Sequence, residues 1–209
     1  MQEIKNITAY RQQLRERIVV TAMHAFAKAG IKAVKMDDIA QELSISKRTL
    51  YEIYENKEVL LFEGVKRYKQ QRRQEFEAKE KKGQNVMDII LTVYQQKVEE
   101  LKLTNPLFYS DIKRYPNILA YLEADKEQAL HQLTAFLERG AKEGFFRSDI
   151  DFELVAHLVN VIPQHIINNQ LYKNYDAELI LRNLVFFNIR GICTQRGIDV
   201  IDRFFDETA

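Results

Sequence analysis

A short run of polar side chains at residues 46–51 has the chemistry of a surface that recognises nucleic acid. It contains Ser46, Lys47, Arg48, Thr49 and Tyr51 around a single leucine. An arginine guanidinium can donate two hydrogen bonds to O6 and N7 of guanine, and a lysine can contact a base or a phosphate. The hydroxyl groups of Thr49 and Tyr51 suit phosphate oxygens. The run therefore predicts DNA binding, with a solvated basic face of a helical hairpin as the alternative.

Two short helices joined by a tight turn must position this run. Apolar residues in residues 36–43 recur at helical spacing, and Asp37 and Asp38 fall in the first turn, where they complement the helix dipole. We interpret those paired carboxylates as structural. Ser46 is a good N-cap for a second short helix, residues 47–54. This is the layout of a helix-turn-helix DNA reader, in which the start of the second helix meets base edges. Chain reversals at Lys35 and Lys57 would bring their ammonium groups to the flanking phosphates.

The remaining sequence is also helical in pattern. An apolar stripe at three- and four-residue spacing runs through residues 10–29 and ends at Gly30, and a longer helix follows Asn56. Further helices are predicted at residues 85–103, about 106–115, 116–140, 151–172 and 177–196. The predicted fold is all-α, with a three-helix DNA-binding domain at residues 1–56 and a larger helical domain at residues 57–209. A linking helix at about residues 57–82 begins the second domain.

Charge is distributed unevenly between these two parts. Residues 11–73 carry 14 Lys and Arg against eight Asp and Glu, a net charge of +6, whereas residues 74–209 carry 16 against 21, a net charge of −5. The whole chain has a formal net charge of only +1. A basic N-terminal third joined to an acidic remainder indicates an anion-binding module carried by a body that need not bind anions, with a chance fluctuation of charge along the chain as the alternative.

Composition excludes several other classes of protein. Three Pro and seven Gly in 209 residues are too few for a sandwich, a barrel or a disordered chain. The single cysteine, Cys193, permits neither an intrachain disulfide nor a cysteine-cluster metal site, and we expect it to be packed and inert rather than a redox switch. Because no membrane span or signal peptide is evident, we expect a cytoplasmic protein.

An enzyme is also disfavoured. The four histidines are scattered, and no metal-ligand cluster, nucleophile motif or cofactor signature is present. We therefore expect no catalytic residues, no metal and no cofactor. A helical interaction protein that uses its basic head on non-specific DNA or on an acidic partner is the alternative to a sequence-specific DNA-binding protein.

The stretch from Arg15 to Leu61 resembles the TetR family of bacterial transcriptional regulators. The similarity lies in Ala25-Phe26-Ala27-Lys28-Ala29-Gly30, Met36-Asp37-Asp38-Ile39-Ala40, Ile45-Ser46-Lys47-Arg48-Thr49-Leu50-Tyr51 and Asn56-Lys57-Glu58, in the family's order and spacing. The resemblance implies a homodimer that binds a roughly palindromic operator and a C-terminal domain that senses a small-molecule effector, most often as a repressor. It assigns DNA contacts to a set of residues around the turn: Ser46, Lys47, Arg48, Thr49, Tyr51 and Lys57. The chain reversal before the first short helix, rather than the resemblance, adds Lys35 to this set.

Some positions depart from the family pattern. Ser44 stands where the turn often has glycine, so the turn either avoids positive φ or carries strain. Lys35 replaces the usual Ser or Thr cap of the first short helix, and Arg48 replaces a frequent small residue. Glu52, beside the same face, is either an acceptor for a cytosine amino group or a repulsive flank, and we favour the second interpretation.

Two further sets of residues follow from the larger domain. The two C-terminal helices have broader apolar surfaces than one core face needs. Together with the resemblance, this indicates a dimer interface, with an ordinary core within one chain as the alternative. We expect that interface to include Val155, Leu158, Ile162, Leu184, Phe186 and Ile189. Aromatic and polar residues on the surrounding helices suggest an effector pocket, although a normal core would fit them equally well. The pocket candidates are Tyr94, Tyr109, Tyr121, His131, His157, Asn160 and Gln164.

Overall fold

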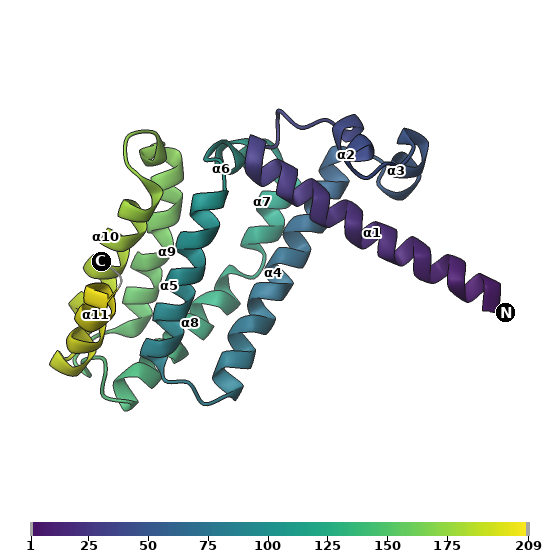
Figure 1. Cartoon of the computed structure of the whole chain (residues 1–209). Helices are drawn as coiled ribbons and strands as arrows, with labels where there is room; N and C mark the ends of the chain where they lie inside the picture. The colour runs from purple at the N-terminus through teal and green to yellow at the C-terminus, as the bar shows by residue number, and fades with distance from the viewer. Residues whose placement is uncertain (1, 208–209) are drawn as a thin grey trace. The chain divides into compact units, whose positions relative to one another are not determined.

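The computed structural model of the chain is helical throughout, which confirms the predicted fold class (Figure 1). It describes residues 2–207, apart from the side chains of residues 2–8, 164 and 186. The helices, in chain order, are α1 (Gln2–Ala29), α2 (Met36–Glu42), α3 (Lys47–Ile53), α4 (Lys57–Lys81), α5 (Val86–Leu103), α6 (Leu107–Asp111), α7 (Pro116–Glu123), α8 (Lys126–Lys142), α9 (Phe152–Asn168), α10 (Ala177–Ile192) and α11 (Gln195–Glu207). Short 3₁₀ turns, Ile112–Arg114 and Leu171–Lys173, follow α6 and α9.

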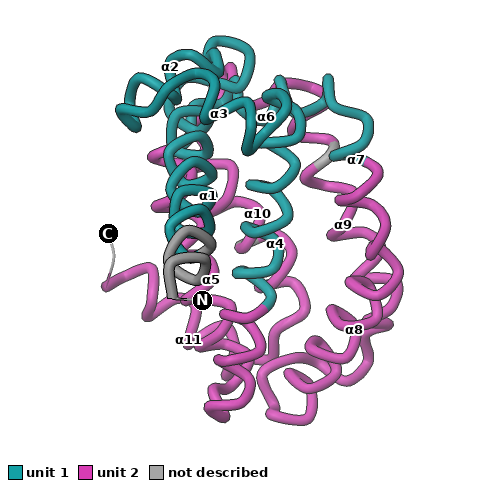
Figure 2. Tube along the Cα trace, turned by 90° about the vertical axis from the view of Figure 1, so that its right-hand side faces the viewer, with its two compact units in different colours: residues 1–73, 104–119 teal, residues 74–103, 120–209 magenta. Residues whose placement is uncertain are grey.

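The chain divides into two compact units, coloured separately in Figure 2. Unit 1 consists of residues 1–73 and 104–119, and unit 2 of residues 74–103 and 120–209. The long helix α4 contributes its first part to unit 1 and its last part to unit 2. The functional boundary that we predicted between residues 56 and 57 coincides with the start of this helix, and it stays a prediction.

The core of unit 1 forms around one stripe of α1. Ile18, Ala22 and Phe26 are fully buried at four-residue spacing, as the apolar pattern predicts. Helix α1 then ends at Gly30, whose φ of +85° is a left-handed conformation that glycine adopts without steric cost. The following loop is fixed by Asp111, whose carboxylate accepts a 2.7 Å hydrogen bond from the Lys32 N–H.

Unit 2 has its own core, which α5, α8, α10 and α11 build together. It is rich in aromatic rings, including the edge-to-face pair of Tyr94 and Phe205 with ring centres 5.2 Å apart. Its buried residues are Val86, Met87, Ile89, Tyr94, Val98, Phe136, Leu137, Phe145, Phe146, Phe152, Ile192, Cys193, Ile201 and Phe205. Gly140 is required for this packing, because a Cβ there would lie only 2.2 Å from the Phe146 ring.

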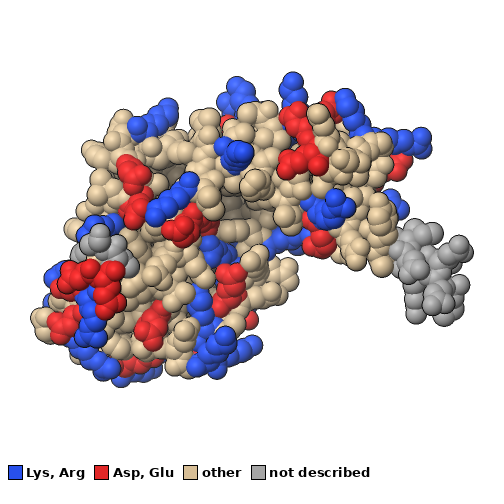
Figure 3. All heavy atoms as spheres, viewed as in Figure 1, with Lys and Arg blue, Asp and Glu red and all other residues tan. Residues whose placement is uncertain are grey.

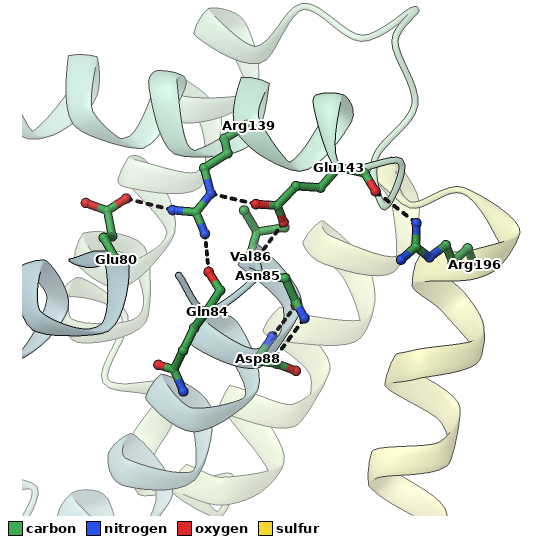
Figure 4. A network of polar contacts seen from close by, with 8 residues as sticks. All are labelled: Glu80, Gln84, Asn85, Val86, Asp88, Arg139, Glu143 and Arg196. Carbon is green, nitrogen blue, oxygen red and sulfur yellow. Dashed lines mark hydrogen bonds and ion pairs between the residues drawn. The ribbon is translucent and has the colours of Figure 1, made fainter. Parts of the chain in front are cut away.

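A polar network around Arg139 ties the end of α4 to α8 within unit 2 (Figure 4). The guanidinium of Arg139 contacts Glu80 at 3.1 Å and Glu143 at 2.7 Å, and it also donates to the Gln84 carbonyl oxygen. The other carboxylate oxygen of Glu143 accepts from the Val86 N–H at 2.8 Å. One arginine therefore fixes both the end of α4 and the start of α5.

The structure differs from the predicted helices in two places. The segment predicted as one helix at residues 116–140 is two helices, separated at Ala124 and Asp125. Helix α11 was not predicted, although Ile201 and Phe205 are buried on one side of it and pack beside α5. The residues at the break, Ala124 and Asp125, are exposed, so no buried side chain marks it in the apolar pattern, whereas α11 packs beside α5.

Candidate nucleic-acid interface

Helices α2 and α3 form a helix-turn-helix whose inner side is apolar. Ile39, Ala40 and Leu50 are buried, and the small Ala40 permits close approach of the two helices. The turn between them contains Ser44 at a φ of +54°. Of the two alternatives for this turn, the structure therefore has the strained one, which costs roughly 1–2 kcal/mol for a residue with a Cβ.

Ser46 begins α3 as predicted. Its hydroxyl oxygen accepts a 3.0 Å hydrogen bond from the Thr49 N–H, and the two hydroxyl oxygens of Ser46 and Thr49 lie 2.8 Å apart. This cap satisfies one of the amide groups that the first turn leaves without a helical partner. The cap fixes the first turn of α3, and with it the direction of the side chains that follow.

The outer side of α3 is basic and highly exposed. The side chains of Lys47 and Arg48 are 67% and 88% exposed, and Tyr51 is also exposed. Figure 3 shows lysine and arginine side chains interspersed with acidic ones over the region of α2 and α3. The residues that the sequence assigned to base recognition thus lie together on one accessible face.

Each of the two cations on this face has an acidic partner within the protein. Lys47 Nζ lies 2.5 Å from Asp37 Oδ2, and Arg48 Nε lies 2.8 Å from Glu52 Oε1. Hydrogen bonding to these carboxylates raises the pKa of both Lys47 and Arg48, so both cations are charged at neutral pH. Exposed pairs of this kind are weak, so phosphates or bases can displace the carboxylates.

The two flanking lysines have different surroundings. Lys35 is exposed just before α2, where its backbone N–H donates to Asp38 Oδ2 at 2.8 Å. Lys57 Nζ instead donates to the carbonyl oxygens of Ile31 and Val34, both at 2.8 Å. Burial lowers the pKa of Lys57, while Asp111 and Asp38 oppose that shift. The Lys57 ammonium therefore holds the loop between α1 and α2 in place through these hydrogen bonds.

Unit 2 contains a cavity of about 500 Å³, a size typical of small-molecule sites. Residues of α5, α8, α9 and α10 line it, together with Phe76 near the end of α4. The lining residues are Phe76, Ile89, Ile90, Val93, Tyr94, Lys97, Ala129, Gln132, Leu133, Phe136, Val159, Ile162, Pro163, Leu181, Leu184, Val185, Asn188 and Ile189. Most of them are apolar.

The predicted pocket residues are only partly brought together. Tyr94 lines the cavity, whereas His131 and His157 are exposed on their helices and Tyr109 belongs to unit 1. Tyr121 and Asn160 are half-buried but are not among the residues lining the cavity, and the Gln164 side chain lies outside the described part of the structure. Periodicity did not reveal the lining, because apolar residues facing a cavity have the same pattern as apolar residues facing a core.

The predicted dimer residues have different surroundings in the structure. Leu158 is 59% exposed, whereas Val155 packs against the core of unit 2. Three others line the cavity: Ile162, Leu184 and Ile189. The side chain of Phe186 is outside the described residues. Other large apolar side chains of α9 and α10 face outward, and we call them, with Leu158, the exposed apolar stripe: Leu154, Leu158, Val161, Leu179 and Phe187.

Cys193 is buried, and burial raises the pKa of its thiol to about 11. This agrees with the expectation of a packed, unreactive cysteine. Among the side chains that the structure describes, no three His, Cys, Asp or Glu residues are placed to hold a metal ion. None of the helices described for this chain is long and apolar enough to cross a membrane.

The fold and the exposed basic face define a helix-turn-helix DNA-binding protein. Residues 18–63 match the sequence model of the family described as bacterial regulatory proteins, tetR family. The matched segment spans the last part of α1, all of α2 and α3 and the first part of α4. No curated protein matches the chain.

Solved structures share the fold over most of the chain at low sequence identity. A putative transcriptional regulator from Saccharomonospora viridis in complex with choline is 18% identical, with a TM-score of 0.69 over 88% of this chain and 99% of that one. A TetR-family regulator from Agrobacterium tumefaciens is 16% identical, with a TM-score of 0.69 over 88% and 100%. The ketosteroid transcriptional regulator KstR2 of Mycobacterium tuberculosis is 19% identical, with a TM-score of 0.58 over 86% and 95%.

Proposed function

We propose that this regulator is a cytoplasmic homodimer that binds a palindromic operator as a repressor and is released from it by a small-molecule effector. The observation that carries the proposal is the exposed pair Lys47 and Arg48 at the capped start of α3, within a tetR-family domain. The start of the second helix is the part of a helix-turn-helix that reaches base edges.

The residues around α3 have different roles in DNA binding. Arg48 discriminates bases, because its guanidinium can bond guanine O6 and N7 together. Lys47 contacts a base or a phosphate, and Ser46, Thr49, Tyr51 and Lys35 bind the phosphate backbone. Lys57 contributes to DNA binding indirectly, since its ammonium donates hydrogen bonds to the carbonyl oxygens of Ile31 and Val34.

The exposed apolar stripe supports dimerisation. Leu154, Leu158 and Val161 lie at four- and three-residue spacing on α9, and Phe187 on α10 is 82% exposed. Large apolar side chains exposed on neighbouring turns of one helix are typical of an interface that a second subunit covers. In a symmetric dimer the same stripe would serve both subunits.

The cavity in unit 2 supports the effector step. Phe76 belongs to α4, the helix whose first part lies in unit 1, and it lines the cavity with its ring centre 5.4 Å from that of Phe136. An effector releases the operator only if it binds the DNA-competent and DNA-incompetent states with different affinities. A coupling of about 1–3 kcal/mol would weaken operator binding about 5- to 150-fold, and the operator would weaken effector binding by the same factor.

Selection of bound sequences from a random pool of double-stranded DNA tests this function. We expect enriched sequences with two inverted half-sites, each read by one α3. Enrichment of single half-sites would contradict a dimeric reader. A pool without any enriched sequence would favour binding to non-specific DNA or to an acidic partner.

A further inference from the structure

We infer that the cavity binds an amphiphile with an apolar chain and one carboxylate end, and that Lys97 selects the carboxylate. The inference rests on the proposed function only in treating this cavity as the effector site. It is carried by the chemistry of the walls and by the single charged side chain among the lining residues.

The walls of the cavity favour an apolar body. Fourteen of the eighteen lining residues are aliphatic, phenylalanine or proline. Burying apolar surface against such walls is favourable in proportion to the area removed from water. A strongly polar body would instead lose its hydrogen bonds to water without replacement. The size and lining of the cavity thus fit a chain or a small ring system.

The polar residues of the lining determine which end group of a ligand the cavity favours. They are Tyr94, Lys97, Gln132 and Asn188, and none of them is a carboxylate. The Asn188 amide nitrogen donates to the Leu184 carbonyl oxygen at 2.8 Å, so this nitrogen is already hydrogen-bonded within α10. The carboxylate of Glu100, beside Lys97, is not among the lining residues. A cationic ligand would therefore meet an ammonium and no carboxylate in the lining itself, whereas an anionic ligand would meet a favourable charge once the Lys97–Glu100 pair opens.

Lys97 is already paired with Glu100, but this pair can be exchanged. Lys97 Nζ lies 2.7 Å from Glu100 Oε1, three residues further along α5, and the two side chains are 37% and 25% exposed. Such pairs along one helix stabilise it only weakly. A ligand carboxylate held by the burial of its own chain would therefore compete with Glu100 for the ammonium.

Three ligands with the same chain and different ends test the inference by isothermal titration calorimetry on the full-length protein, below their micelle concentrations. They are dodecanoate, dodecanol and dodecyltrimethylammonium. We expect dodecanoate to bind at least about tenfold more tightly than dodecyltrimethylammonium, with dodecanol between them. Equal or tighter binding of the ammonium compound, or no binding of any of the three, would overturn the inference.

The Lys97→Met variant tests whether the preference for a carboxylate ligand depends on the Lys97 side chain. It keeps the length of the side chain and removes its charge, so we expect dodecanoate affinity to fall about tenfold while dodecanol affinity stays unchanged. Lys126→Met removes an exposed lysine of α8 that does not line the cavity, and it should change neither affinity. An equal loss in both variants, or no loss in either, would remove Lys97 from the inference.

A gel-shift titration with operator DNA separates this inference from the proposed function. Dodecanoate that binds but leaves operator affinity unchanged would contradict the effector step and leave the ligand class supported. A different compound that fills the cavity and releases the operator, with no binding of dodecanoate, would overturn the ligand class and support the effector step.

Discussion

Arg48 Nε lies 2.8 Å from Glu52 Oε1, one helical turn further along α3. The side chain that is best suited to read a guanine therefore has a carboxylate beside it on the same exposed face. DNA must displace that carboxylate or tolerate it next to the phosphates. This geometry supports the interpretation of Glu52 as a repulsive flank rather than a reader of cytosine.

The Glu52→Gln variant tests that interpretation. Removal of the carboxylate frees Arg48 and removes a repulsive charge, so we expect operator affinity to rise about two- to fivefold at near-physiological salt. Glu55→Gln is the matched control, because it removes one exposed acid just beyond α3. A gel-shift titration in which Glu52→Gln lowers affinity at operators containing cytosine would instead identify Glu52 as a base reader.

Arg48→Ala and Lys57→Met should affect DNA binding in different ways. Arg48→Ala should reduce discrimination between operator variants more than overall affinity. Lys57→Met should weaken binding to all sequences alike and lower the free energy of unfolding by about 1–2 kcal/mol, because the carbonyl oxygens of Ile31 and Val34 lose their shared donor. Urea denaturation and titration of an operator series measure the two effects, and the same loss pattern for both variants would refute this division.

The dimer proposal predicts the effect of a charge placed in the exposed apolar stripe. Phe187→Glu should shift the protein toward a monomer in sedimentation analysis and weaken operator binding at least about tenfold, because a charge would be buried between the subunits. Leu103→Glu is the control, since Leu103 is 77% exposed on α5, outside the stripe. An unchanged dimer in Phe187→Glu would show that other residues hold the subunits together.

The Cys193 thiol should be unreactive in the folded protein. Its pKa of about 11 leaves about one thiolate in a thousand at pH 8, and the side chain is buried. Because the pKa is higher in the folded than in the unfolded chain, stability is unaffected below the ordinary thiol pKa and decreases as pH rises toward 11. Labelling with a thiol reagent should be slow until urea unfolds the protein, and fast labelling of the native state would contradict this account.

Much of the DNA-binding unit could be predicted from sequence because its signals are local. The cap at Ser46, the stop at Gly30 and the apolar spacing around Ala40 all act within one or two helical turns. The partners of the cations were harder to predict, because Asp37 and Lys47 lie on different helices. The role of Lys57 likewise depends on a loop 23–26 residues earlier in the chain.

Unit 2 was less predictable for a physical reason. Its helices are apolar on more than one side, so periodicity identifies the helices but not which side faces the core, the cavity or a second subunit. Ile162 and Leu184 illustrate this, since we expected them at a dimer interface and they line the cavity. The place of Phe76 in the cavity likewise depends on its contact with Phe136 of another helix.

The central claim is that this protein reads a specific operator, and the ratio of specific to non-specific affinity tests it most directly. The measurement is a gel-shift titration of the selected sequence against scrambled DNA of the same length at fixed, near-physiological salt. We predict a preference of about a thousandfold or more for the selected sequence. Equal affinity for both DNAs would contradict the claim, because phosphate contacts alone would then account for binding.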